Sequence, residues 1–358
     1  MDQSYQNMNG NHKAARAYCD GCFDLVHFGH ANHIRQAKAL CDYLVVGVHS
    51  DAEIAHHKGP TVFNQDERYR LVKAIKWTDE IVENAPYSPT KELLDKNNCE
   101  VCIHGAELTL NADGTDTFAE VKRLGRYREC KRTEGVSTTD LVAHMLKLTT
   151  ENSIVEAKDL PDLQMVSVRK NELDRTETIM QFVSDRRPQP GERIVYACGA
   201  FDLFHIGHLC FLEEAAKLGD YLIVGIHADD VVEQLNGQNH PIMALPERAL
   251  SVLSYKPVSE VIIGAQYSVT QDFMESYKID LVVCGQAEKQ RKDPATGLDP
   301  FEAPKESGKF KLINSGSNVT TAQIVQRIAA NRAEFHLRNE KKLAKGKIAV
   351  QVLEEKAA

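Results

Sequence analysis

Short apolar runs alternate along the chain with longer stretches in which apolar residues recur every three or four positions. Tyr43–His49 is almost continuously apolar, which is typical of a strand whose two faces are both covered by helices. In the first half the pattern predicts strands at Ala15–Cys19, Tyr43–His49, Glu80–Glu83, Cys99–His104 and Tyr127–Lys131. It predicts helices at His30–Leu40, Gln65–Lys76, Pro89–Lys96, Thr117–Leu124 and Thr138–Leu148. The same order returns at Ile194–Cys198, Leu209–Leu218, Tyr221–His227, Leu245–Leu253, Val261–Gly264, Asp280–Cys284 and Thr320–Ile328. This alternation predicts an α/β fold with parallel sheets flanked by helices.

The two halves also share a motif. Gly21-Cys-Phe-Asp-Leu-Val-His-Phe-Gly-His30 returns 178 residues later as Gly199-Ala-Phe-Asp-Leu-Phe-His-Ile-Gly-His208. Because solenoid repeats run to roughly 20–50 residues, this period indicates a duplicated domain. The 358 residues then divide into a polar tail at 1–14, a first domain at 15–150, a linker at 151–192, a second domain at 193–332 and a charged tail at 333–358. We expect that last tail to form a helix, either solvated or at an interface.

Composition and charge exclude several classes of partner. The chain has 43 Lys+Arg against 51 Asp+Glu, a net charge of −8, which argues against binding to nucleic acid. No apolar run approaches the ~20 residues of a membrane span, and the N-terminus lacks the apolar core of a signal peptide. The nine cysteines are odd in number and scattered, as in reduced proteins. We therefore expect a cytoplasmic protein without integral membrane segments. The oligomeric state stays open, with a homodimer among the options.

Two C-x-x-C pairs, Cys19/Cys22 and Cys99/Cys102, raise the question of a zinc or redox site. Cys99 and Cys102 fall on a predicted strand, where residues three apart point to opposite faces. The second half has alanine at the positions of Cys19 and Cys22. We therefore predict no protein-bound metal.

His27-Phe-Gly-His30 follows a predicted strand and lies where the next helix begins. In an open parallel sheet, ligands bind at the carboxyl ends of the strands, and helix N-termini favour phosphate. Gly29 lets a bulky anion approach the backbone, and the two imidazoles can donate hydrogen bonds to its oxygens. A His-x-x-His pair alone is more often a surface accident or a metal pair. In the repeated frame after a strand, it predicts a phosphate site.

This frame resembles the HxGH nucleotidyltransferase superfamily, which has a Rossmann-like fold. Arg132-Thr-Glu-Gly-Val-Ser-Thr-Thr139, which opens a predicted helix, narrows the resemblance to the cytidylyltransferase family. An arginine, a glycine turn and hydroxyls at a helix N-terminus suit a triphosphate. An ordinary N-cap would explain Ser137 but not Arg132. The resemblance implies transfer of CMP from CTP, as its Mg²⁺ complex, with catalytic His27, His30, Lys58 and Arg132. It implies nucleotide binding by Gly21, Cys22, Phe23, Gly29, His104, Gly105, Thr133, Gly135, Ser137 and Thr138.

Lys58 lies in a loop with Gly59 and Pro60, where the family places a lysine that reaches the α-phosphate. A lone loop lysine is usually solvated, so this role comes from the resemblance. Arg68 matches an Arg-Tyr stretch of the family and is predicted to be partly structural and partly nucleotide-facing.

Two such domains without a long amphipathic helix resemble the branch of the family that acts on phosphoethanolamine. The family resemblance assigns the amine to Asp20 and Tyr87, although loop capping by Asp20 and simple packing of Tyr87 stay open. The second aromatic of a choline cage is missing from 104–110.

The halves differ at the positions that carry charge. Asn236 replaces Lys58 and Cys198 replaces Asp20, while alignment of the second motif sets Asn314 against Arg132. We therefore expect catalysis in the first domain only. The second keeps a candidate nucleotide site at Ala200, Phe201, His205 and His208. The alternative functions are transfer of CMP to another phospho-alcohol, such as phosphocholine, or a non-catalytic role as a nucleotide-sensing scaffold.

Overall fold

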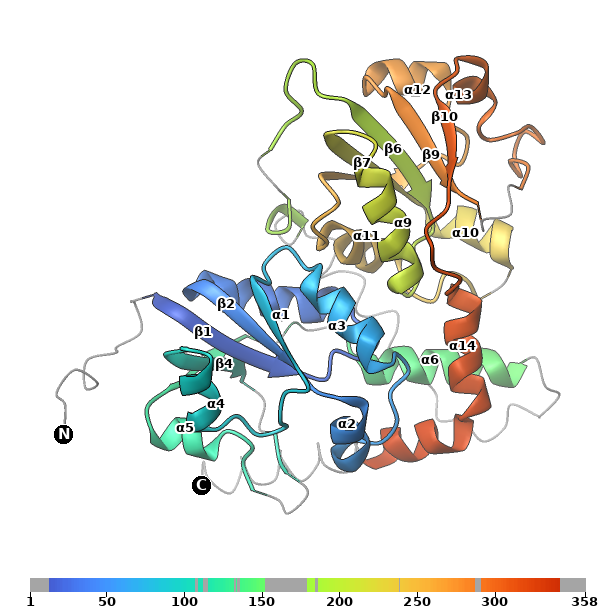
Figure 1. Cartoon of the computed structure of the whole chain (residues 1–358). Helices are drawn as coiled ribbons and strands as arrows, with labels where there is room; N and C mark the ends of the chain where they lie inside the picture. Colours follow the sequence, from blue (N-terminus) through green and yellow to red (C-terminus); the bar gives the residue numbers. More distant parts are fainter. Residues whose placement is uncertain are drawn as a thin grey trace. The chain divides into compact units, whose positions relative to one another are not determined.

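The computed structural model describes residues 13–106, 109–111, 115–131, 133, 136–151, 179–183, 186–237, 239–286 and 291–341 (Figure 1). The chain divides into two compact units, Met1–Leu146 with Arg327–Ala358, and Lys147–Gln326. The residues from Arg327 onward thus belong to the first unit, whereas the sequence pattern ends the second domain at residue 332.

The first unit is built on a five-stranded parallel sheet in the order β3-β2-β1-β4-β5. Its strands are β1 (Ala14–Gly21), β2 (Cys41–Val48), β3 (Glu80–Glu83), β4 (Val101–Gly105) and β5 (Tyr127–Cys130). The helices that follow these strands are α1 (Phe28–Ala39), α2 (Asp51–His57), α3 (Gln65–Lys73), α4 (Lys91–Lys96), α5 (Ala119–Arg123) and α6 (Thr138–Glu151). Residues 332–341 are also helical.

The second unit repeats this plan with the parallel strand order β10-β9-β6-β7-β8. Its strands are β6 (Ile194–Gly199), β7 (Tyr221–His227), β8 (Glu260–Ala265), β9 (Leu281–Gly285) and β10 (Phe310–Ile313). Its helices are α9 (Ile206–Ala216), α10 (Asp229–Asn236), α11 (Leu245–Leu253), α12 (Gln271–Ser276) and α13 (Glu302–Glu306). Helix α14 (Thr321–Ala330) begins in this unit, and its residues from Arg327 onward belong to the first unit. The predicted pair of Rossmann-like α/β domains is confirmed.

The apolar periodicity decides which faces are buried. In β1, Ala17, Tyr18 and Cys19 are completely buried, as expected for a central strand covered on both sides. On α1 the buried residues recur every three or four positions, at Phe28, Ala31, Ile34 and Ala37. Each sheet therefore packs its core against helices that lie along the strands (Figure 1).

Several short elements were not predicted. Helices α2 and α10 are 7 and 8 residues long and bury one residue each, Ile54 and Val232, so their apolar pattern is too short to mark a helix. α12, α13 and β10 are similarly short. The other predicted elements are present, with ends that shift by a few residues. Among the described helices, none is both long and apolar enough to cross a membrane.

The strand order changes direction at β1, which lies between β2 and β4. The chain builds β2 and β3 on one side of β1 and then crosses over to build β4 and β5 on the other. Such a switch point leaves a crevice beyond the carboxyl ends of the central strands. The loops after β1, β2 and β4 carry the candidate functional residues to this edge.

Candidate active site

The loop between β1 and α1 has an unusual backbone. Phe23 and Leu25 have φ of 51° and 48°, and their equivalents Phe201 and Leu203 have φ of 49° and 47°. Non-glycine residues in this left-handed region cost about 1–3 kcal/mol each, so the surroundings must hold them there. The Phe23 ring covers Gly21, where an added Cβ would lie 3.1 Å from the ring. Both copies thus keep the same strained loop at the carboxyl end of the central strand.

His27 and His30 form a pair at the start of α1. His27 is the N-cap, and its Nδ1 accepts a hydrogen bond from the Gly29 backbone N–H at 3.1 Å. The Nδ1 of His30 accepts from the His27 backbone N–H at 3.3 Å, and the ring centroids are 3.9 Å apart. Because a nitrogen that accepts carries no proton, each ring is a neutral imidazole with its proton on Nε2. Both rings can therefore donate an Nε2–H to a phosphate oxygen.

Gly29 is required by close packing. A Cβ at this position would lie 2.8 Å from Val136 Cγ1 and 2.9 Å from the His27 ring. The missing side chain therefore makes room for Val136 of the second motif and for the His27 imidazole, rather than only for an approaching anion. This contact joins the two predicted nucleotide-binding strings.

The hydroxyls of the second motif have structural partners. Ser137 Oγ accepts from the Asp140 backbone N–H at 3.1 Å, as in an ordinary N-cap. Thr138 Oγ1 donates to the Asp24 carbonyl at 3.0 Å, and Thr133 Oγ1 accepts from Asn32 Nδ2 at 2.8 Å. The Thr138 bond ties the start of α6 to the β1–α1 loop, and the Thr133 bond ties the segment before α6 to α1. Arg132 and Gly135 lie outside the described residues.

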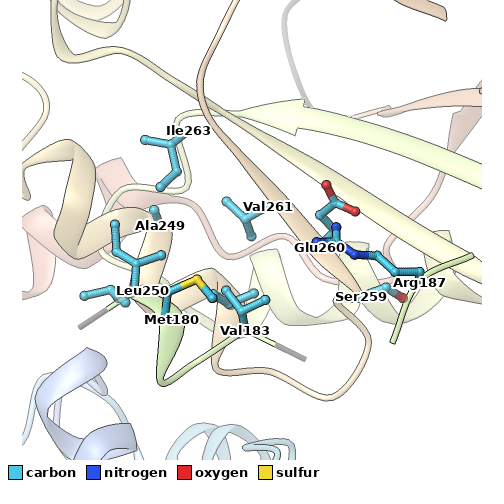
Figure 2. A pocket seen from close by; sticks show the side chains of 11 residues that line it. Met180, Val183, Arg187, Ala249, Leu250, Ser259, Glu260, Val261 and Ile263 are labelled. Atoms are coloured by element: carbon cyan, nitrogen blue, oxygen red, sulfur yellow. The ribbon is translucent and has the colours of Figure 1, made fainter. Parts of the chain in front are cut away.

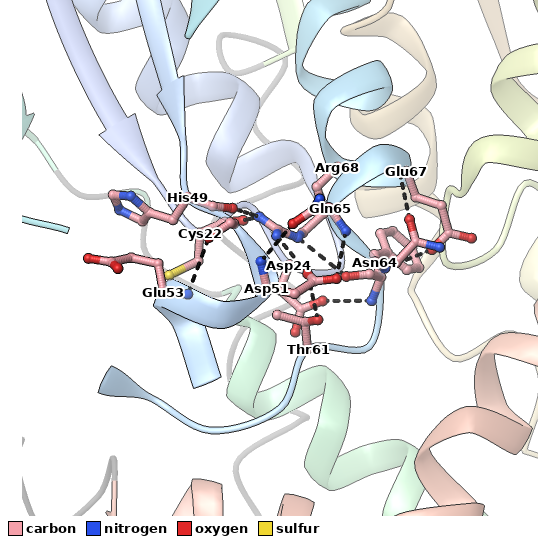
Figure 3. A network of polar contacts seen from close by, with 12 residues as sticks. Cys22, Asp24, His49, Asp51, Glu53, Thr61, Asn64, Gln65, Glu67 and Arg68 are labelled. Atoms are coloured by element: carbon pink, nitrogen blue, oxygen red, sulfur yellow. Dashed lines mark hydrogen bonds and ion pairs between the residues drawn. The ribbon is translucent and has the colours of Figure 1, made fainter. Parts of the chain in front are cut away.

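Asp24 and Arg68 shape the loops around the site (Figure 3). The buried Asp24 carboxylate accepts the backbone N–H groups of Val62 at 3.0 Å and Phe63 at 2.9 Å. Arg68 is fully buried and donates to the carbonyls of Cys22 and His49, both at 2.7 Å, and to Asp51. Arg248 makes the same set of bonds to Ala200, His227 and Asp229. Arg68 is thus a structural residue that joins the loop after β1 to the loop after β2 and the start of α2.

Lys58 ends α2 as its C-cap residue. Its ammonium turns toward the β1–α1 loop, with Nζ 5.4 Å from the centroid of the Tyr87 ring. The neighbouring Cys22 sulfur raises the pKa of Lys58 above its usual value, and the Tyr87 hydroxyl acts in the same direction against the effect of burial. The site therefore holds a positive charge close to Cys22, in the loop that leads to His27 and His30 at the start of α1.

Asp20, at the end of β1, is a buried carboxyl that lacks a full set of hydrogen bonds. Its side chain is 4% exposed, and within the described part of the chain Oδ2 has no hydrogen-bond partner. Burial raises the pKa of Asp20 to about 7, while the Lys58 charge opposes the shift. A carboxylate in this state gains most from a new cationic donor. Loop capping, the alternative role for Asp20, leaves this oxygen unexplained.

Tyr87, the second residue assigned to the amine, belongs to a group of three aromatic rings. Tyr87 is buried, stacks on His57 with centroids 4.0 Å apart and planes at 9°, and lies 5.4 Å from His49. His49 donates from Nδ1 to the Ala85 carbonyl at 3.0 Å, because the carbonyl can only accept. Burial lowers the pKa of His49 to about 4, so this ring stays neutral. Tyr87 therefore packs within an aromatic group rather than standing alone.

His104 and Gly105 end β4. Burial lowers the pKa of His104 to about 4, and its ring lies 4.2 Å from Phe118 and 5.9 Å from His33. His33 Nδ1 is 3.1 Å from Cys130 Sγ, and burial lowers the pKa of His33 to about 3. These contacts pack His33 of α1 against His104 of β4 and Cys130 of β5.

The second unit repeats the histidine geometry. His205 Nδ1 accepts from Gly207 at 3.1 Å, His208 Nδ1 accepts from His205 at 3.4 Å, and the ring centroids are 3.9 Å apart. Phe201 lies 5.3 Å from the His208 ring, and His205 Nε2 lies 3.3 Å from Thr321 Oγ1. Ala200 supplies the carbonyl that Arg248 binds. The imidazole pair is therefore intact, although its charged neighbours differ.

The pairing of the strands changes one of the residue equivalences between the two domains. Gly105 pairs with Cys130 and Gly285 pairs with Ile313, while Thr138 and Thr321 make the same hydroxyl bond to the carbonyls of Asp24 and Asp202. Both comparisons place equivalent residues 183 positions apart, one more than the alignment of Arg132 with Asn314. The residue at the Arg132 position is thus Ser315, which is equally uncharged. Asn236 keeps its equivalence with Lys58, since α2 and α10 begin at the matching Asp51 and Asp229.

The second unit also contains a pocket of about 230 Å³ with a mainly apolar lining, formed by Met180, Val183, Leu250, Val261, Ile263 and six other residues (Figure 2). Arg187 and Glu260 supply its charged groups. Neither His205 nor His208 lines it, so this pocket is separate from the nucleotide motif of the second unit.

The parallel sheets, the switch point and the paired imidazoles define a nucleotidyltransferase. A cytidylyltransferase-like family model matches residues 18–144 and 196–301. Three relatives are each called ethanolamine-phosphate cytidylyltransferase. The one from Mus musculus is 48% identical over 94% of this chain and 91% of its own length. Those from Dictyostelium discoideum and Arabidopsis thaliana are 47% and 43% identical over 94% of this chain, and 96% and 85% of their own lengths. The chain belongs to the cytidylyltransferase-like family and, within it, to the ethanolamine-phosphate cytidylyltransferases.

Sequence reasoning missed the aromatic neighbours of Tyr87. His49 follows β2 and returns as His227 after β7, where it again bonds a backbone carbonyl, that of Ala265, at 3.1 Å. The repetition of this histidine in both halves could have identified His49 from the sequence. His57 gave no such signal, because the second copy has Leu235 at its position.

Proposed function

We propose that the first domain transfers CMP from CTP to phosphoethanolamine, giving CDP-ethanolamine and pyrophosphate. The observation that carries the proposal is the combination of two neutral imidazoles with Nε2–H donors and the Lys58 ammonium beside the same loop. The names of the three relatives support the choice of donor and acceptor.

The reaction is an in-line displacement at the α-phosphorus of CTP. A phosphate oxygen of phosphoethanolamine forms a bond to this phosphorus, and the bond to the oxygen that bridges the α- and β-phosphates breaks. Pyrophosphate leaves with the electron pair, so no side chain has to act as nucleophile or base. Transfers of this type depend on positioning and on charge stabilisation. His27, His30, Lys58 and, by resemblance, Arg132 supply both. Mg²⁺ enters as part of the substrate, bound to the triphosphate of CTP.

The amine of phosphoethanolamine binds Asp20 in this proposal. Oδ2 of Asp20 has no hydrogen-bond partner among the described residues, and an ammonium brings three donors and a positive charge. The ring of Tyr87 offers a face for the same cation. Choline's trimethylammonium donates no hydrogen bond and would leave Oδ2 unpaired, which favours phosphoethanolamine over phosphocholine.

The second domain is assigned a structural or nucleotide-sensing role. It keeps His205 and His208 but has Asn236, Cys198 and Ser315 where the first domain has Lys58, Asp20 and Arg132. Loss of one preorganised charge donor typically costs about 10²–10³ in rate, so loss of two leaves little turnover. We place the reaction in the cytoplasm, because all nine cysteines are free thiols.

The test is pyrophosphate release from CTP and Mg²⁺ with a panel of phosphoethanolamine, phosphocholine and glycerol phosphate. We expect the highest kcat/KM with phosphoethanolamine. Turnover of phosphocholine at an equal kcat/KM would overturn the acceptor assignment. Folded protein that releases no pyrophosphate with any acceptor would favour the sensing scaffold instead.

A further inference from the structure

The loop that carries Lys58 is held by the C-terminal segment of the chain. Asp24 fixes the far end of this loop through the N–H groups of Val62 and Phe63. Asp202 does the same in the second unit, through Ile242 at 2.7 Å and Met243 at 3.0 Å. This pair of bonds is therefore common to both domains and does not distinguish the catalytic one.

Two arginines add contacts in the first unit. Arg338 Nη1 donates to Asp24 Oδ2 at 2.8 Å and to the Pro60 carbonyl at 2.5 Å. Arg327 donates to both oxygens of Glu67, at 2.7 Å and 2.8 Å, and to the Val62 carbonyl at 3.1 Å. Both arginines belong to the first compact unit, although Arg327 lies in α14, within the second domain as the sequence delimits it, and only Arg338 follows that domain. The two arginines thus hold the loop through the carbonyls of Pro60 and Val62, two and four residues after Lys58.

Burial strengthens the Arg338–Asp24 and Arg327–Glu67 ion pairs. The side chains of Asp24 and Glu67 are 2% and 9% exposed, and that of Arg338 is 12% exposed. Ion pairs in such a setting are little screened by water, and the bidentate Arg327–Glu67 pair adds directional specificity. Glu67 also caps α3 by accepting the Asn64 N–H at 2.9 Å, so Arg327 acts on the end of the loop where α3 begins (Figure 3).

The stem of Arg338 also lies against the residue next to Lys58. An added Cβ at Gly59 would be 3.5 Å from Arg338 Cβ and 3.6 Å from its Cγ. Gly59 has φ of 99°, a conformation that other residues rarely adopt, so the turn after Lys58 is closely defined. In the part of the second unit that the structure describes, Asp202 has no matching ion pair with an arginine.

We propose that Arg338, assisted by Arg327, is a positioning residue for catalysis in the first domain: it fixes the 58–63 loop so that Lys58 meets the charge that develops on the transferred phosphate. The C-terminal segment thereby makes first-domain turnover depend on chain that follows the second domain. This inference rests on the proposed function, because it requires Lys58 to stabilise charge on the transferred phosphate.

The experiment uses the full-length protein and the variants Arg338→Ala, Arg338→Lys, Lys58→Ala and the double variant Lys58→Ala/Arg338→Ala. Lys341→Ala is the matched control, because it removes a cation from the same helical stretch at an exposed position. We expect Arg338→Ala to lower kcat by about 10–100-fold, the cost of a small misplacement of a catalytic group. The KM for CTP should change less than about threefold, and Arg338→Lys, which keeps a charge and N–H donors, should recover part of the rate.

The double variant separates positioning from general damage. If Arg338 acts through Lys58, its removal should cost less than about threefold once Lys58 is already alanine. Effects that multiply in the double variant, or a kcat within twofold of wild type for Arg338→Ala, would overturn the proposal. Should Arg338→Ala fail to fold, Arg338→Gln, which removes the charge and keeps a polar side chain, takes its place under the same criteria.

Amide hydrogen exchange at Val62 and Phe63 gives a readout that needs no turnover. Both N–H groups are bonded to Asp24, so we expect faster exchange in Arg338→Ala than in wild type or Lys341→Ala. If wild-type protein releases no pyrophosphate, the proposed function fails while exchange still tests whether Arg338 holds the loop. Unchanged exchange in folded Arg338→Ala would refute that hold directly.

Discussion

Asp20→Asn should make the protein more stable and less able to use its acceptor. Burial raises the pKa of Asp20 from its ordinary 3.8 to about 7. A shift of about three pKa units corresponds to about 4 kcal/mol of unfavourable free energy for holding the charged carboxylate in the folded state. Asparagine has nearly the same shape and no charge, so it removes this cost. The unligated variant should therefore gain stability at a pH where Asp20 is ionised.

The direction in which stability changes with pH follows from proton linkage. Between pH 3.8 and 7 the folded protein keeps a proton on Asp20 that the unfolded chain has released, so stability falls as the pH rises through this range. Above about pH 7 both states are ionised and the loss is complete. The stability difference between Asp20→Asn and wild type should thus be small near pH 4, grow up to pH 7 and then stay constant.

Thermal unfolding at pH 5, 6, 7 and 8 measures this difference, with the other titrating groups cancelling between the two proteins. We expect Tm of Asp20→Asn to exceed that of wild type by on the order of 5–10 °C at pH 8, and by much less at pH 5. The control is Asp42→Asn, because Asp42 is exposed. Its Tm difference from wild type should not change with pH. A difference in Tm that is absent at pH 8, or equal at pH 5 and 8, would refute the reasoning.

The same substitution should harm function. Loss of a charge-assisted hydrogen bond costs about 1.5–3 kcal/mol, so KM for phosphoethanolamine should rise about 10–100-fold in Asp20→Asn. The KM for CTP should stay nearly constant, because this carboxyl is assigned to the amine alone. An unchanged affinity for phosphoethanolamine would remove Asp20 from the acceptor site.

The remaining predictions concern the nucleotide. His30→Ala should lower kcat by about 10² or more through loss of a preorganised donor, whereas His208→Ala should act more weakly. Equal severe losses of kcat in the two folded variants would reveal a second working site. Removal of Mg²⁺ with EDTA should abolish pyrophosphate release, and added Mg²⁺ should restore it, since the metal neutralises the triphosphate. Turnover that persists in EDTA would exclude the Mg²⁺ complex of CTP as the substrate.

The repeat and the apolar periodicity were sufficient to predict two α/β domains. Strands such as β2 and β7 are apolar along almost their whole length, and both faces of a central strand must be apolar when helices cover them. The repeated histidine motif marks the loop after the first strand of each domain. These features are local, so they can be read without knowing which elements meet.

Single residues whose role depends on distant partners were beyond the sequence. Asp24 belongs to the predicted motif, but nothing local indicates that its carboxylate holds the loop 38 residues further on. The aromatic group around Tyr87 joins a residue after β2, the last residue of α2 and a residue after β3, and it forms only when the sheet brings those ends together. Likewise, Arg338 is one charge in a polar tail until the fold places it 2.8 Å from Asp24. Periodicity reports which face of an element is buried, whereas the pairing of buried charges depends on where the chain returns in space.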